Sequence, residues 1–283
     1  MRPYYQRVSY RLLRRLRRKL RVRVGPHSIV VPMGESGTLS SLWWTPSWKS
    51  ELIASFLASK SGGDFLDVGA NVGQTLFDFV STGSKARYFG FEPNMGCVAY
   101  LDRLIRDNGL ESARIIPVAL GSRASVVELH RQKNSATDSG AFIDPSIRPG
   151  LQTCSEFISC HPFDEIVDQV GIGRIALCKI DVEGFEAETL DGMRKTLEMR
   201  RFPILCEVLD ADPQADAALH DVRLKRIETL LSECRYRIER VEKGAEGGLA
   251  GLAPIAALPR RRYDEQSKEA CDYLFSPMER SRS

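Results

Sequence analysis

The sequence lacks long apolar runs and paired cysteines. Its longest apolar stretch, residues 249–258, has ten residues and contains a proline, whereas a membrane-spanning helix needs about 20. The seven cysteines are scattered between Cys97 and Cys271 and include no C-x-x-C pair. An odd, dispersed set is a poor disulfide framework and fits a reducing compartment. We therefore expect a cytoplasmic protein without a transmembrane helix, and we assign no metal site.

Acidic residues are absent from the first 24 positions. Ten of the 40 Lys and Arg lie there, and the other 30 face all 37 Asp and Glu, so the rest of the chain carries about −7. A negative body is not typical of a nucleic-acid-binding fold, and we expect no nucleic-acid partner. The segment also lacks the apolar core and the cleavage site of a secretory signal.

The basic segment itself has several interpretations. If it is helical, Leu12, Leu16 and Leu20 share one face, which would suit an anionic membrane surface or an acidic partner. It would then place the protein at the membrane periphery. A solvated helix, a disordered arm and an Arg-rich organellar presequence are the alternatives.

The body of the chain alternates short apolar runs with helical periodicity. With 43% hydrophobic and 27% charged residues, the composition is that of an ordinary globular protein. Ser47 is the expected N-cap of the first helix, and residues 131–161 read as a long polar loop. Strands are expected at 64–68, 87–91, 114–120, 125–130, 175–180, 203–209, 236–241 and 272–275, and helices near 48–61, 74–82, 94–108, 185–200 and 219–231.

This alternation predicts an α/β fold with a mostly parallel sheet covered by helices on both faces. The last two strands, 236–241 and 272–275, lack a helix between them. We expect them to pair as a C-terminal antiparallel hairpin, with the Gly/Ala-rich residues 244–262 as an excursion.

A ligand site is predicted where the first two strands of the regular region end. Ligands of open α/β sheets bind at the carboxyl ends of the strands. The first strand runs into a turn with two glycines, and the second ends in an acidic residue that can accept hydrogen bonds from both hydroxyls of a ribose. The candidate cofactor-binding residues are Asp67, Gly69, Asn71, Gly73, Glu92 and Asn94.

The cofactor is expected to be S-adenosylmethionine (SAM) rather than NAD. Both carry an adenosine, so Glu92 does not distinguish them. Asp67 does, because a carboxylate beside the glycines repels a pyrophosphate but attracts the ammonium and sulfonium groups of SAM. The spacing from Gly69 to Gly73 also departs from the G-x-G-x-x-G form of NAD sites.

A second charged cluster ends the strand at 175–180. Lys179, Asp181 and Glu183 alternate, so they point to one side if the strand continues. Buried charges are costly unless they are paired or used. An internal ion pair with carboxylates at a helix N-terminus is the structural alternative.

These segments resemble the FkbM-type SAM-dependent methyltransferases. The resemblance covers roughly residues 47–277, and implies a Rossmann-like class I methyltransferase fold with a seven-stranded sheet. We accordingly divide the chain into a basic arm (1–24), a linker or irregular hairpin (25–46), the methyltransferase domain (47–277) and a tail (278–283). The resemblance to the FkbM family is carried by six segments: Phe65–Gly73, Phe91–Asn94, Lys179–Glu186, Leu190–Gly192, Pro203–Val208 and Asp272–Phe275.

The resemblance implies O-methylation of a hydroxyl on a sugar, glycan or natural product. An alcohol oxygen must lose its proton during or after attack, so a positioned carboxylate is needed. Asp181 and Glu183 are the candidate bases, Lys179 orients a carboxylate or the substrate oxygen, and His161 is the reserve candidate. A catalytically silent SAM-fold scaffold and an NAD-dependent oxidoreductase are the alternative functions.

Overall fold

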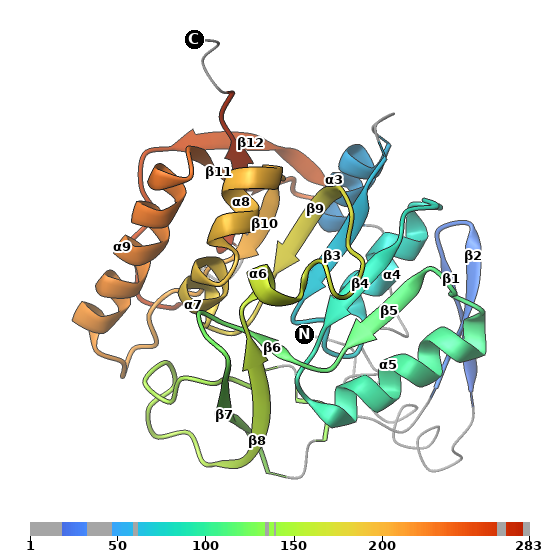
Figure 1. Cartoon of the computed structure of the whole chain (residues 1–283), viewed down its shortest axis with the longest axis horizontal. Coiled ribbons are helices and arrows are strands. Elements are labelled where there is room, and N and C mark those ends of the chain that lie inside the picture. Colours follow the sequence, from blue (N-terminus) through green and yellow to red (C-terminus); the bar gives the residue numbers. More distant parts are fainter. Residues whose placement is uncertain are drawn as a thin grey trace.

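The centre of the protein is an eight-stranded sheet in the order β12-β11-β13-β10-β9-β3-β4-β5 (Figure 1). The computed structural model describes residues 19–32, 47–58, 62–133, 136–138, 140–264 and 270–279. The strands from β10 to β5 are parallel, and β13, β11 and β12 are antiparallel to their neighbours, so the mostly parallel α/β sheet is confirmed. The strands are β3 (Asp64–Val68), β4 (Tyr88–Phe91), β5 (Ala113–Ile116), β9 (Ile175–Ile180), β10 (Ile204–Glu207), β11 (Tyr236–Lys243), β12 (Leu249–Ile255) and β13 (Asp272–Pro277).

The C-terminal hairpin is confirmed, but the expectation of seven strands is wrong. β11 and β13 pair antiparallel, with Ile238 opposite Phe275. The eighth strand, β12, lies within the excursion at 244–262 and pairs with β11 at the edge of the sheet. An edge strand tolerates glycine and proline, here Gly251 and Pro254, because one side of its backbone needs no partner. Its Gly/Ala-rich composition therefore hid a strand.

Helices cover both faces of the sheet, as predicted. Alternate residues of each strand point to opposite faces, so Leu66 and Phe89 pack against α6 to α9, whereas Phe65 and Tyr88 pack against α3 to α5. Ser47 caps α3, with its backbone N–H donating to the Ser50 hydroxyl. The helices are α3 (Trp48–Leu57), α4 (Gln74–Ser81), α5 (Met95–Asn108), α6 (Phe163–Ile166), α7 (Glu186–Asp191), α8 (Arg194–Arg200) and α9 (Ala217–Glu233).

The helix expected over 185–200 is two helices, α7 and α8, with a break at Gly192. A Cβ atom at Gly192 would lie 2.1 Å from the Gly121 carbonyl oxygen. The backbones of two segments therefore meet at this point. The 3.6-residue periodicity continues through the break, so the sequence alone did not reveal it.

A separate three-stranded sheet projects beside the lower ends of β3 and β4 in Figure 1. It consists of β6 (Ala119–Leu120), β7 (Ser125–Gln132) and β8 (Thr153–His161) in the order β6-β8-β7. The long loop expected over 131–161 is therefore wrong at both ends. β7 and β8 pair along eight residues, and Ile158 and Cys160 are buried on the inner face. Apart from exposed Phe157, the outer face of β8 is polar, so the segment looked like a loop.

The N-terminal described residues form a hairpin. β1 (Leu20–Val24) pairs antiparallel with β2 (His27–Val31) through a turn at Gly25 and Pro26. Val24 and Val31 are fully buried in the core with α4 and α5. The expectation of an arm through residue 24 is wrong for residues 20–24, because these residues belong to the folded core. Of the two alternatives for the next segment, residues 27–31 bear out the hairpin and not the linker, although its first strand begins at residue 20.

The rest of the basic arm, residues 1–18, lies outside the described residues. This includes Leu12 and Leu16 of the apolar face expected there, whereas Leu20 begins a strand. Among the residues that the structure describes, no helix is long and apolar enough to cross a membrane.

Candidate active site

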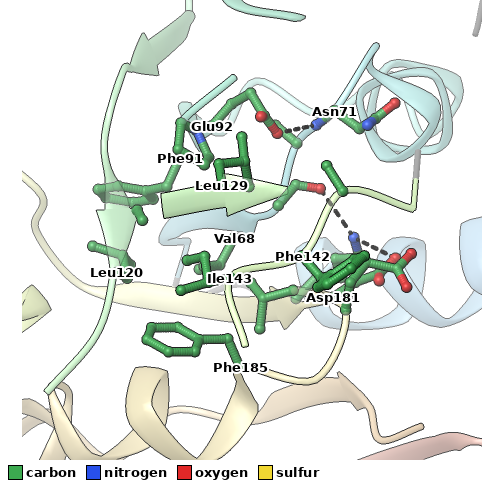
Figure 2. A pocket seen from close by; sticks show the side chains of 18 of the residues that line it. Val68, Asn71, Phe91, Glu92, Leu120, Leu129, Phe142, Ile143, Asp181 and Phe185 are labelled. Atoms are coloured by element: carbon green, nitrogen blue, oxygen red, sulfur yellow. Dashed lines mark hydrogen bonds and ion pairs between the residues drawn. The ribbon is translucent and has the colours of Figure 1, made fainter. Parts of the chain in front are cut away.

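A cavity of about 270 Å³ lies at the carboxyl ends of β3, β4 and β9 (Figure 2). The chain passes from β3 to β4 on one side of the sheet and later places β9 on the other side of β3. This reversal of strand order creates a crevice where α/β sheets bind ligands. The side chains of β7 and of the loop after it cover the crevice. The apolar wall consists of Val68, Phe91, Val118, Leu120, Leu129, Phe142, Ile143 and Phe185.

The glycine-rich turn after β3 forms one edge of the cavity, but for a reason different from the one expected. Gly69 has φ +84°, and a Cβ atom there would lie 1.9 Å from the carbonyl oxygen of Asp181. Gly73 has φ +88° at the start of α4, and its Cβ would press on Leu101. Both glycines thus permit close packing within the protein, and of the two only Gly69 lines the cavity.

Glu92 lies at the other edge of the cavity with its carboxylate held by two backbone donors. The N–H groups of Asn71 and Asn94 donate to Glu92 Oε2 and Oε1 at 2.7 and 2.8 Å. Burial raises the pKa of Glu92 to about 7, although these two hydrogen bonds oppose the shift. Figure 2 shows Glu92 facing Asn71 across the turn. The carboxylate is fixed in position at the place predicted for a ribose.

Asn71 connects the turn to the loop that covers the cavity. It has φ +46°, in the left-handed region that asparagine tolerates. Its Nδ2 donates to the carbonyl of Asp138, 3.2 Å away, while its Oδ1 accepts from the Val72 N–H. Asn71 and Asp138 both line the cavity.

Two of the predicted cofactor-binding residues lie beneath the cavity surface instead. Asp67 is fully buried, accepts a hydrogen bond from the Tyr88 hydroxyl, and has Oδ1 3.5 Å from Lys179 Nζ. Burial raises the pKa of Asp67, and Lys179 counteracts part of that shift. Asn94 is the N-cap of α5, with Oδ1 accepting from the Gly96 N–H. Neither side chain lines the cavity, so both residues support its wall from beneath.

Lys179 and Asp181 form the charged edge of the cavity at the end of β9. Lys179 Nζ lies 3.1 Å from Asp181 Oδ2 and 3.5 Å from the Gly69 carbonyl oxygen. Burial opposes the charge on both groups, but their mutual attraction raises the pKa of Lys179 and lowers that of Asp181. Both groups therefore stay charged at neutral pH.

Glu183 lines the same cavity but does not form an ion pair with Lys179. β9 ends at Ile180, and Glu183 has φ +54°, so the strand alternation expected to align the three charges does not continue. Its carboxylate instead pairs with the guanidinium of Arg148. Burial, and then the charge of Asp181, raises the pKa of Glu183 to about 7, and Arg148 opposes this shift. At the end of β9, Asp181 is thus ionised, whereas Glu183 titrates near neutral pH.

Several residues at the site were not predicted from the sequence. Lys49, from the first turn of α3, lines the cavity beside Asp181. Glu207 ends β10, the neighbour of β9, and the charge of Asp181 together with burial raises its pKa to about 9. A carboxylate at the end of a parallel strand is the same signal that identified Glu92, so the rule applied to β10 would have found Glu207.

His161, the reserve candidate for the base, lies away from the cavity. His161 ends β8, where its carbonyl accepts from the Gly121 N–H, and it lines neither this cavity nor the next one along the sheet. In the part of the chain that the structure describes, no three His, Cys, Asp or Glu side chains are grouped to hold a metal ion.

The sequence profile of the family described as "Methyltransferase FkbM domain" matches residues 67–238. The chain belongs to the FkbM methyltransferase family. The match includes the glycine turn, Glu92 and the end of β9, so the ends of all three cavity strands lie within the family domain. The protein is therefore a methyltransferase.

Two relatives with curated names are similar to part of the methyltransferase. The hexuronic acid methyltransferase AglP of Haloferax volcanii is 28% identical over 193 residues, which are 68% of this chain and 71% of that protein. The 2-O-methyltransferase NoeI of Sinorhizobium fredii is 26% identical over 157 residues, 52% of this chain and 63% of that protein. Among solved structures, an FkbM methyltransferase from Methylobacillus flagellatus is 17% identical with a TM-score of 0.45, covering 76% of this chain and 43% of that one.

Proposed function

We propose that this methyltransferase transfers a methyl group from SAM to a hydroxyl of a sugar. The observation that carries the proposal is the cavity at the strand reversal, with the fixed carboxylate of Glu92 at one edge and the charged end of β9 at the other. The names of the two relatives, one acting on a hexuronic acid and one at a 2-O position, support a sugar hydroxyl as the acceptor.

The residues around the cavity fit SAM. Glu92 would accept hydrogen bonds from the ribose hydroxyls, because its position at the end of β4 and its two backbone donors fix the carboxylate. Phe91, Val118 and Leu129 provide an apolar wall for a flat base. Asp181 would attract the cationic end of the molecule. Bound SAM would supply a methyl group on a sulfonium, a donor that needs no further activation.

The protein's own task is then to orient the acceptor and remove its proton. Glu183 is the proposed base, because it lies at the end of the cavity beside Asp181. Its pKa of about 7 suits a group that must accept a proton near neutral pH. Asp181 is held by Lys179 and is the less basic of the two carboxylates. We assign it the role of fixing charge beside the reacting atoms.

The test is to replace each carboxylate by its amide, Glu183→Gln and Asp181→Asn. Loss of a general base lowers turnover by about 10²- to 10⁴-fold, so Glu183→Gln should bind SAM normally and transfer the methyl group slowly. Each variant is compared with the wild type for thermal midpoint, SAM affinity by calorimetry and single-turnover transfer. The matched control is Glu165→Gln, an exposed glutamate on α6.

A folded Glu183→Gln variant with a normal transfer rate would remove Glu183 from the mechanism. Calorimetry of the wild type with NAD tests the alternative that the protein is an NAD-dependent oxidoreductase. Binding of NAD without binding of SAM would contradict the proposed function as a whole. SAM binding without transfer to any sugar would instead support the silent scaffold.

A further inference from the structure

A second cavity, of about 380 Å³, adjoins the first at the ends of β9 and β10. Glu183 lines both cavities, so its carboxylate stands at the boundary between them. The second cavity is not part of the crevice assigned to SAM, and no residue of the glycine turn lines it. Its position beyond the proposed base is the position that an acceptor must occupy.

The walls of the second cavity are rich in hydrogen-bond acceptors. Glu207, Asp210 and Asp212 line it together with Glu183. Among the described residues of its wall Arg148 is the one cation, and it is already paired with Glu183. The Asp210 side chain is only 3% exposed. Its Oδ1 accepts from Arg261 at 3.2 Å, but its buried Oδ2 has no hydrogen-bond partner among the described residues.

An unpaired buried carboxylate oxygen is costly. A ligand hydroxyl that donates to Asp210 Oδ2 would remove this cost.

The same cavity has one aromatic wall. Tyr263 is 40% exposed and lines it together with the acidic residues. The backbone N–H of Tyr263 donates to the Ala211 carbonyl at 2.8 Å, and the preceding residue, Arg262, forms a bridge with Ala211. The backbone that carries the ring is therefore held against the segment that follows β10. An exposed aromatic face next to several hydrogen-bond acceptors is suited to a sugar ring, which has apolar C–H faces and a rim of hydroxyls.

We propose that the second cavity binds the acceptor as an uncharged sugar ring, with Tyr263 against one face and the carboxylates of Asp210 and Asp212 accepting from its hydroxyls. This inference rests on the proposed function and specifies its acceptor. A uronate would bring a negative charge next to Asp212, and the arginines that contact this acidic wall, Arg148 and Arg261, are already paired with Glu183 and Asp210. Like charges at these distances repel, so the cavity selects against it.

The remainder of a larger acceptor would lie in a groove next to the second cavity. Arg148, Asp212 and Tyr263 line a shallow groove that continues outward from the second cavity between residues 149–151 and 213–214. A sugar bound through its reacting hydroxyl near Glu183 would direct its other end toward this groove. The acceptor ring can therefore be part of a longer glycan or glycoconjugate.

The experiment measures ligand binding to the full chain saturated with S-adenosylhomocysteine. The probes are methyl pyranosides of the gluco, galacto and manno series and the corresponding methyl uronosides, titrated by saturation-transfer NMR. We expect at least one neutral glycoside to bind saturably and its uronoside to bind at least about tenfold more weakly. Tyr263→Ala should weaken binding of the neutral glycoside by about three- to tenfold. Asp212→Asn should reduce the difference in affinity between the neutral glycoside and its uronoside.

The matched control is Phe157→Ala, which removes an aromatic ring that is 76% exposed on β8 and lines neither cavity. It should leave all affinities unchanged. The inference is overturned if no neutral glycoside binds, if a uronoside binds as tightly, or if Tyr263→Ala behaves like the control.

Binding of S-adenosylhomocysteine is measured first on every protein. Its absence from the wild type would refute the proposed function and this inference with it. Its presence together with any of the three outcomes above refutes the inference alone.

Discussion

Glu92 and Asp67 show how two carboxylates at adjacent strand ends acquire different roles. Glu92 follows the last residue of β4 and lines the cavity, whereas Asp67 lies one residue before the end of β3 and points to the face covered by α3 to α5. Asp67 is paired with Tyr88 and Lys179. Its charge therefore acts on the site through Lys179, which in turn contacts Asp181.

Glu92→Ala should lower SAM affinity by about 10- to 100-fold, the equivalent of about 1–3 kcal/mol for unpaired hydrogen-bonding groups. The substitution removes the acceptor proposed for the ribose, and it also leaves the N–H groups of Asn71 and Asn94 without their partner. Calorimetric titration measures the affinity. Glu111→Ala, at an exposed turn before β5, is the control. Equal SAM affinity in the two variants would contradict the ribose assignment.

Gly69→Ala should destabilise the fold far more than an ordinary glycine substitution. At Gly69 a Cβ atom would lie 1.9 Å from the Asp181 carbonyl oxygen, so β3 and β9 would have to separate. Gly247 is the matched control, because its φ of +83° is nearly that of Gly69 (+84°) but nothing lies within 4 Å of its Cβ position.

Gly247→Ala should therefore cost only the backbone strain, about 1–2 kcal/mol, and Gly69→Ala several kcal/mol more. Urea unfolding of both variants measures the difference. Equal losses would show that the clash relaxes without cost.

At the scale of elements, the hairpin β1–β2 joins the end of the basic segment to the folded core. Its first strand carries the last two arginines of the basic segment, Arg21 and Arg23, while Val24 and Val31 are buried. Asn108, at the end of α5, adds a further connection, because its side chain accepts from the Val30 N–H at 2.6 Å and donates to the Val30 carbonyl. The hairpin is thus part of the layer that covers one face of the sheet.

Removal of residues 1–18 should leave SAM affinity and thermal stability unchanged. Seven of the ten N-terminal Lys and Arg lie within residues 1–18, so the truncation should weaken salt-sensitive binding to anionic vesicles. Removal of residues 1–31 should instead destabilise the protein strongly, because it exposes the core that Val24, Ile29 and Val31 cover.

Vesicle sedimentation and thermal melting distinguish these effects. A stable protein without residues 1–31 would show that the hairpin is not needed for the fold. Loss of SAM binding in a folded protein lacking only residues 1–18 would place the arm at the site.

At the scale of the whole molecule, buried glutamates set the pH dependence of stability. Burial raises the pKa values of Glu92, Glu183 and Glu186 to about 7, and the charge of Asp181 with burial raises that of Glu207 to about 9. The folded protein thus holds protons that the unfolded chain releases at about pH 4.3. This contribution to stability is complete below that pH and is lost as the pH rises through 7 and then 9.

The thermal midpoint should therefore fall by several degrees between pH 6 and pH 8.5. Glu186→Gln should reduce this slope, because Glu186 is 1% exposed and accepts from the Gly184 N–H through one oxygen. Differential scanning fluorimetry across the range measures both proteins. A midpoint that rises with pH in this window would contradict the assigned pKa directions.

The sequence alone determined the order of most elements and the location of the site. Apolar runs of period two and helical periodicity are local properties, so β3, β4, β9 and the helices between them were predictable. These elements also predicted a ligand site at the carboxyl ends of the strands. It was marked by the glycine-rich turn, by Glu92 at the end of β4 and by the charged end of β9. The same patterns carried the resemblance to the FkbM family that the profile match confirmed.

Only the tertiary structure decided which side chains meet. Arg148 pairs with Glu183 across 35 positions, Tyr263 reaches the second cavity from beyond β12, and Lys49 comes from the first helix of the core. Such contacts depend on how distant segments pack, and one sequence has no local signal for them. The turn at Glu183 similarly redirects its carboxylate through a left-handed φ that strand periodicity does not anticipate. Local patterns thus fixed where the strands end, while long-range packing fixed which groups face one another there.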